Sequence, residues 1–175
     1  MLSCFGEKRD YTRLLRETTF HQSPADSIRR ISRDDVLIGH LTQSSDSTPP
    51  GEHLSFCSLV EITGGKRKHI PLLDFHCPET CENDKLVSEV CKQITDADVL
   101  LFSSGESYHA LGLELLEEDG LRRFLTRSLL FAPIVDSRYV AHQLLEGACA
   151  LRLSYSATKP TRPWLKLLAR STSQQ

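Results

Sequence analysis

The sequence has no apolar run that approaches the ~20 residues that a membrane-spanning helix needs. Its first ten residues also lack the apolar core of a signal peptide. These absences exclude an integral membrane protein, and we expect the protein to act in the cytoplasm without membrane contact. Its 175 residues are enough for one domain with a hydrophobic core.

The six cysteines lack the regular spacing of a disulfide framework, so we expect reduced thiols. The only metal-like spacing is His76-Cys77 with Cys81, followed by Cys91. Structural zinc sites usually contain two complete ligand pairs, and here the second pair is incomplete. Buried or incidental cysteines are the favoured interpretation, and the sequence leaves open whether Cys77 and Cys81 bind zinc. A glycine-framed G-x-S-x-G motif is also missing, which argues against a serine hydrolase.

The net charge is only −2, which argues against nonspecific nucleic-acid binding by the whole surface. The charge is unevenly distributed, because residues 121–175 contain nine Lys or Arg against two Asp or Glu. We therefore expect this basic C-terminal third to meet an anionic ligand or a nucleic acid. The alternative is a solvated basic helix and tail.

The hydrophobic pattern predicts an α+β fold. Residues 54–62 and 68–75 predict a hairpin, residues 99–103 and 108–116 a second hairpin, and residues 148–155 a last strand. Helices are predicted over residues 83–93, capped by Asn83 or Asp84, and over residues 117–130 and 138–145. From residue 68 onward this order is the split βαβ unit of RRM-like and ferredoxin-like folds, an antiparallel sheet with helices on one face.

Residues 1–53 are predicted to form a short N-terminal α/β extension that ends in a polar loop. Ser23 and Pro24 have the pattern of a helix start, and residues 36–41 read as a strand. The Ser, Thr, Asp and Pro-rich residues 43–52 predict a loop. The expected organisation is therefore an extension over residues 1–53 and a core over residues 54–175.

Acidic and imidazole residues follow two apolar segments. Asp74 and His76 follow residues 70–73, and Asp136 follows the predicted strand 133–135. Neighbouring carboxylates repel each other unless a cation neutralises them, so Asp74 and Asp136 predict a Mg²⁺ or Mn²⁺ site. His76 favours manganese or zinc over magnesium as the third ligand. The alternative is that the aspartates cap loops and the histidine has a structural role.

Other polar residues suit the phosphates of a nucleotide. Ser107 and His109 alternate along a predicted strand and share one face. Arg152 and Ser156 share a face of the last predicted strand, Lys159 follows, and a guanidinium is well shaped to grip a phosphate. The alternatives are a structural hydrogen bond for His109 and a surface charge for Arg152.

Together these motifs resemble the archaeo-eukaryotic primase and primase-polymerase superfamily. Members have an acidic pair D-x-D or D-x-E at the end of a strand, then S-x-H on a hairpin, a single aspartate, and a strand L-R-x-P-x-S before a basic loop. The corresponding residues here are Asp74-Phe75-His76, Ser107-Tyr108-His109, Asp136, and Leu151 to Ser156 with Lys159. The resemblance covers roughly residues 68–160.

The resemblance implies a catalytic group of Asp74, His76 and Asp136, which would transfer nucleotides in primer synthesis. Family chemistry uses three carboxylates to hold two divalent ions, whereas here His76 replaces one of them and Ser154 replaces the usual proline. The resemblance thus implies a small, divergent member of the superfamily. Three hypotheses follow: a metal-dependent primase-polymerase-like protein that binds a nucleoside triphosphate, an inactive primase-like subunit of a larger nucleic-acid or defence assembly with a protein partner, or an unrelated ferredoxin-like binding domain. The sequence does not distinguish DNA from RNA.

Overall fold

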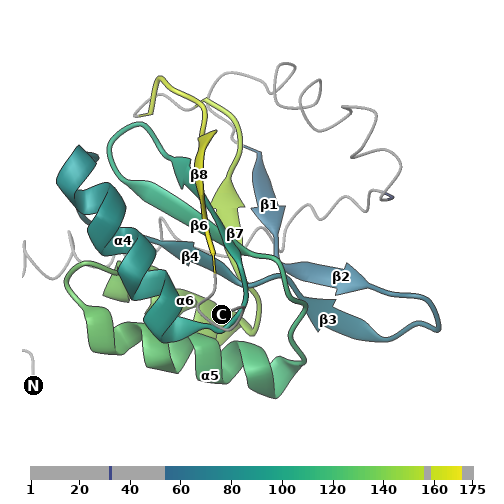
Figure 1. Cartoon of the computed structure of the whole chain (residues 1–175). Coiled ribbons are helices and arrows are strands. Elements are labelled where there is room, and N and C mark those ends of the chain that lie inside the picture. Colours follow the sequence, from purple (N-terminus) through teal and green to yellow (C-terminus); the bar gives the residue numbers. More distant parts are fainter. Residues whose placement is uncertain (1–31, 33–53, 156–158, 171–175) are drawn as a thin grey trace, which may run out of the picture.

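The computed structural model describes residue 32, residues 54–155 and residues 159–170 (Figure 1). These residues form helices and antiparallel β-sheet, so the predicted α+β class is confirmed. The helix and strand predicted between residues 1 and 53 lie outside the described residues, apart from Ser32. Within the described part of the chain, no helix has the length and apolarity to cross a bilayer.

The largest sheet has four antiparallel strands in the order β4, β6, β5, β8. Their bounds are Leu72–Asp74 for β4, Val99–Ser103 for β5, Tyr108–Gly112 for β6 and Trp164–Ala169 for β8. The β5–β6 hairpin is the one predicted, but β6 ends at Gly112 instead of at residue 116. A Cβ atom on Gly112 would lie 2.9 Å from Cγ of Pro71, so only glycine allows this close approach.

The edge strand β8 lies in a C-terminal segment for which no strand was predicted. Conversely, the predicted last strand is β7 (Ala150–Arg152), which pairs with β1 (Ser55–Cys57) in a separate two-stranded sheet. β6 lies between β4 and β5 in the sheet, and the α4 helix connects β4 to β5 along the chain. An RRM-like sheet would include the last predicted strand, over residues 148–155, as its fourth strand. Because β7 lies outside the four-stranded sheet, the specific RRM-like arrangement is not confirmed.

The single strand predicted over residues 54–62 divides at Ser58. After this residue, β2 (Leu59–Glu61) pairs with β3 (Arg67–His69) to form the predicted hairpin, which projects from the body in Figure 1. The buried Ser58 hydroxyl accepts a hydrogen bond from the Cys149 N–H at 2.8 Å and lies 3.2 Å from Nδ1 of His69. Ser58 thus hydrogen-bonds to residues next to β7 and in β3, at the point where the chain passes from pairing with β7 to pairing with β3.

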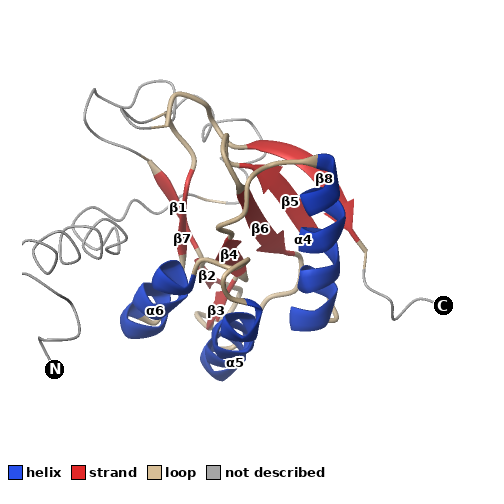
Figure 2. Cartoon of the chain, turned by 90° about the vertical axis from the view of Figure 1, so that its left-hand side faces the viewer, coloured by secondary structure: helices blue, strands red, loops and turns tan. Residues whose placement is uncertain are grey.

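Three helices pack near the strands. Figure 2 shows α4 (Cys81–Ile94) beside β5 and β8, with α5 (Glu118–Ser128) and α6 (Ser137–Glu146) to its lower left. Thr80 caps α4, because its hydroxyl accepts from the N–H of Asn83 at 3.1 Å; the predicted caps Asn83 and Asp84 are wrong. A 3₁₀ turn, η3 (Leu129–Phe131), follows α5.

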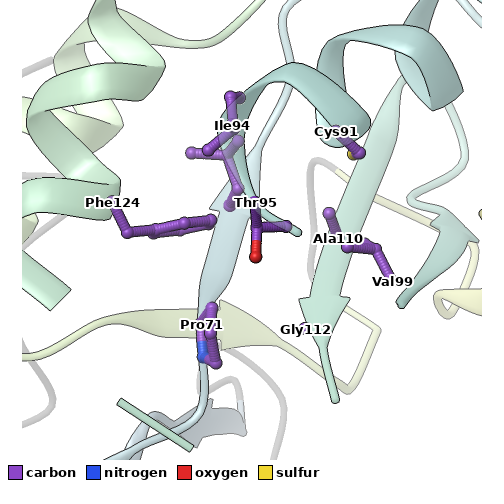
Figure 3. Close-up of a pocket in the computed structure, with 9 residues that line it drawn as sticks. Pro71, Cys91, Ile94, Thr95, Val99, Ala110, Gly112 and Phe124 are labelled. Carbon is purple, nitrogen blue, oxygen red and sulfur yellow. The ribbon is translucent and has the colours of Figure 1, made fainter. Parts of the chain in front are cut away.

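The core lies between the central sheet and the helices, where burying one leucine side chain contributes about 1.5–3 kcal/mol. Leu101, Leu121 and Leu125 are almost completely buried there. Figure 3 shows a cavity of about 10 Å³ where the end of α4 meets Phe124 of α5 and the sheet. Its lining is apolar and it has room for one water molecule at most, so we interpret it as a packing defect.

Candidate functional site

The structure brings Asp74 and Asp136 together. The N–H of Asp136 donates to the carbonyl of Asp74 at 3.0 Å, and the neighbouring Phe75 and Val135 form an isolated antiparallel bridge. The strand predicted over residues 133–135 is wrong, because within the described ranges this bridge is its only strand pairing. Asp136 instead begins α6, where its Oδ1 accepts from the N–H groups of Arg138 at 2.9 Å and Tyr139 at 3.1 Å. Such N-caps contribute about 0.5–2 kcal/mol to stability.

The Asp74 carboxyl is destabilised in its charged form. Its side chain is 21% exposed, and burial together with the negative charge of Asp136 raises the pKa of Asp74 to about 7. The positive charges of Lys159 and Arg152 oppose this rise. Burial and a neighbouring negative charge both disfavour the charged form of a carboxyl, so a bound cation would stabilise the ionised form of Asp74.

His109 lies directly opposite Asp74 in the β4–β6 register. Its Nε2 is 3.6 Å from Oδ1 of Asp74, and its side chain is 10% exposed. Burial, with the nearby charges of Arg152 and Lys159, lowers the pKa of His109 to about 3. The imidazole is therefore neutral at physiological pH, and one ring nitrogen can donate a hydrogen bond while the other accepts one.

Arg152 has a different geometry from the one predicted. Its guanidinium donates to the carbonyl oxygens of Ser104 at 2.8 Å and Thr161 at 2.9 Å, and also to that of Ser154. The planar fork thus ties the turn between β5 and β6 to the segment after β7. The nearby Lys159 forms an ion pair with Glu106 on the same turn. Sequence reasoning missed Glu106, since nothing in the local pattern pairs it with a residue so distant in the chain.

The remaining predicted residues are placed as follows. The Ser107 hydroxyl donates to the carbonyl of Phe75 at 2.6 Å and supports the strand end that precedes it. Ser156 lies outside the described residues. His76 is exposed, and its N–H donates to the carbonyl of Ile134 at 2.7 Å.

No group of three or more His, Cys, Asp and Glu residues in the described ranges is arranged to hold a metal ion. The metal site of Asp74, His76 and Asp136 therefore stays a prediction. Zinc at Cys77 and Cys81 also stays a prediction; Cys77 is buried, and Cys81 is exposed at the start of α4.

A second polar cluster was not predicted. The Tyr108 hydroxyl donates to Oδ1 of Asp84 at 2.7 Å, and Lys166 Nζ lies 2.6 Å from the same carboxylate. Lys166 also pairs with Glu79 at 2.9 Å, and the Ser103 hydroxyl donates to Glu79. These contacts connect β8 to the start of α4, and their only sequence signal is a lone lysine within an apolar stretch.

The fold and these polar residues together define an α+β protein with two adjoining aspartates and a neighbouring histidine. Residues 38–163 match the family model described as AEP-like, archaeo-eukaryotic primase 1D-like. The match spans well over half of the chain and every predicted site residue, so the chain belongs to this primase-like family, and the predicted resemblance is confirmed. No curated protein and no solved structure matches the chain.

Proposed function

We propose that this protein binds a nucleoside triphosphate together with Mn²⁺ or Mg²⁺ at the site around Asp74 and Asp136. The observation that supports the proposal most directly is the main-chain hydrogen bond of 3.0 Å between Asp136 and Asp74, which holds the two acids side by side. Burial, and after it the negative charge of Asp136, raises the pKa of Asp74 to about 7. A divalent cation between them would remove this repulsion, and His76 would complete the ligand set. The family assignment supports a nucleotide as the ligand.

The surrounding residues suit the phosphates. Lys159 supplies a positive charge, and the neutral imidazole of His109 can donate one hydrogen bond. Arg152 would act by holding the turn between β5 and β6, because its donors already bind main-chain carbonyls. We also propose that β4, α4, β5 and β6 correspond to the split βαβ unit of an RRM-like fold.

If the site is catalytic, the expected reaction is nucleotidyl transfer in primer synthesis. The 3′-hydroxyl of a growing strand would attack the α-phosphorus and lose its proton, and pyrophosphate would leave with the electrons of the broken P–O bond. A bound divalent ion would supply charge stabilisation at the transferring phosphate. Asp74 and Asp136 would hold that ion, and His109 would orient a phosphate oxygen.

A second function is an inactive primase-like subunit of a larger nucleic-acid or defence assembly, which would act through a protein partner. Three observations favour it. The side chains of Ser107 and of Arg152 each donate hydrogen bonds to main-chain carbonyls, so their donors are already used. His76 replaces the second carboxylate of the acidic pair of the family. The basic C-terminal third would then contact nucleic acid. The family match argues against the third hypothesis, an unrelated binding domain.

Calorimetric titration with ATP or dATP, in Mn²⁺ and then in Mg²⁺, tests the first proposal. Asp74→Asn and Asp136→Asn are the informative variants, because asparagine keeps the shape of both sites and still caps α6. Asp119→Asn, on the exposed face of α5, is the matched control. Metal-dependent binding that both site variants lose would support the proposal, and no binding by the wild type in either metal would reject it. Primer extension then separates the catalytic from the inactive alternative.

A further inference from the structure

Glu106 is held by a rigid turn between β5 and β6. The N–H of Ser104 donates to the carbonyl of Ser107 at 2.9 Å, and the N–H of Ser107 donates to the Ser104 hydroxyl at 3.2 Å. Gly105 has a φ of +101°, which side chains rarely adopt. The carbonyl of Glu106 itself accepts from the N–H of Glu79 at 3.2 Å. The Glu106 side chain therefore starts from a well-defined position.

The carboxylate of Glu106 forms an ion pair with the ammonium group of Lys159. The Lys159 side chain is 35% exposed and that of Glu106 is 67% exposed. Lys159 is also within electrostatic range of both Asp74 and His109, on whose ionisation it acts. One cation thus lies within reach of the candidate nucleotide site and of a carboxylate outside it.

An ion pair this exposed is weak, because water screens it and two side chains must be ordered. A polyphosphate carries several negative charges and forms stronger, charge-assisted hydrogen bonds with an ammonium group. The Lys159 ammonium cannot form its closest ion pair with a polyphosphate and with Glu106 at the same time. Binding of the polyphosphate must therefore displace the carboxylate or place two anions side by side.

We propose that Glu106 is a specificity-determining residue, an internal anion that occupies Lys159 until the polyphosphate of the nucleotide displaces it. This inference rests on the proposed nucleotide site. Its consequence is that weakly charged anions, which gain little from Lys159, do not displace the carboxylate. The site would thereby favour polyphosphates over single inorganic anions such as phosphate.

The test measures the affinity of ATP and of inorganic triphosphate, each with Mn²⁺, by calorimetry at low salt. Replacing Glu106 by glutamine is expected to increase the affinity for both ligands by about two- to fivefold, which corresponds to the loss of a competing exposed ion pair. Glu146→Gln makes the same charge change at the other end of α6, about 15 Å along the helix from Asp136. This control is expected to bind like the wild type.

A double-variant cycle with Lys159→Gln separates competition for Lys159 from simple repulsion. If Glu106 acts through Lys159, Glu106→Gln gains less affinity in the Lys159→Gln background than in the wild type. An equal gain in both backgrounds, or no gain in either, would overturn the inference while leaving the nucleotide site in place. Absence of ATP and triphosphate binding by every variant would overturn both the inference and the proposed function.

Discussion

Asp74 shows how the sequence of one strand end determines a pH response. Its folded pKa of about 7 lies above the ordinary value of 3.8, so the folded state favours the neutral carboxyl. This contribution to stability is complete below about pH 4 and is lost as the pH rises towards 7. Without divalent ions, the wild type should therefore lose stability relative to Asp74→Asn between pH 4 and pH 8, by roughly 4 kcal/mol.

Urea unfolding of both proteins across this pH range, in the presence of a chelator, measures the difference. The comparison between wild type and variant cancels the titration of groups that both share. Parallel stability curves would show that the Asp74 carboxyl ionises as freely as in the unfolded chain.

Arg152 provides a second prediction for a single residue. Arg152→Lys keeps the charge but loses the planar fork that reaches the carbonyls of Ser104 and Thr161. We expect it to lower the free energy of unfolding by about 1–2 kcal/mol, since hydrogen bonds to a charged donor are lost. Thermal unfolding measures the effect, with Arg123→Lys on the exposed face of α5 as the control. Unchanged stability together with lost ATP binding would instead favour the phosphate-binding role that the sequence suggested.

Single residues were predictable where local pattern and family motif agreed. Asp74 and His109 do meet, because each lies within a strand whose apolar pattern was clear, and the bridge between Phe75 and Val135 places Asp136 beside them. The functions of Ser107 and Arg152 were not predictable, because their partners are main-chain carbonyls from other segments. No local pattern indicates which carbonyl a distant side chain will meet.

Among the elements, β8 is joined to the start of α4 through one partly buried lysine. Lys166→Met would leave Glu79 and Asp84 without their cation, although their side chains are only 22% and 21% exposed. We expect a loss of about 2–4 kcal/mol of unfolding free energy, near the lower end for a broken buried ion pair. Chemical denaturation measures it. Neutralising both acids in the same chain, with Glu79→Gln and Asp84→Asn, should recover part of the loss; no recovery would mean that packing of the Lys166 stem dominates.

The elements themselves were predicted unevenly. The β5–β6 hairpin and the α5 and α6 helices follow local periodicity, and Gly147 ends α6 in the left-handed conformation. Leu145 near the end of α6 is 83% exposed, whereas Tyr139 of the same helix is buried. The division of the first strand at Ser58 depends on Cys149 and His69, which lie far along the chain, so periodicity alone could not show it.

At the scale of the whole molecule, the family match ends at residue 163, but the sheet continues through β8. A chain cut after residue 163 would expose β5 as a new edge and leave Glu79 and Asp84 without Lys166. Exposed edge strands promote association between chains. We expect the shortened protein to aggregate or to unfold at lower temperature, which light scattering during thermal unfolding would detect. A shortened chain that stays monodisperse with unchanged thermal stability would contradict this.

The α+β class and the family could be predicted because they depend on the order of the elements and on short motifs. Strand neighbours outside the two predicted hairpins could not be predicted, since residues that lie far apart in the chain decide them. For example, the N–H of Leu54 donates to the Ser154 hydroxyl at 2.9 Å across the β1–β7 sheet. Two apolar segments near the C-terminus, which form β7 and β8, could each have paired with β5. The sequence does not indicate that β8 is the one that does.

The double use of Asp136 limits which substitutions can survive during evolution. Its short side chain must reach two N–H groups at the start of α6, and its charge must remain if the protein binds a cation. Glutamate keeps the charge but is a poor cap, whereas serine, threonine and asparagine cap well without the charge. Lineages that retain nucleotide chemistry should therefore keep aspartate at this position, and lineages that have lost it should drift first to asparagine, serine or threonine.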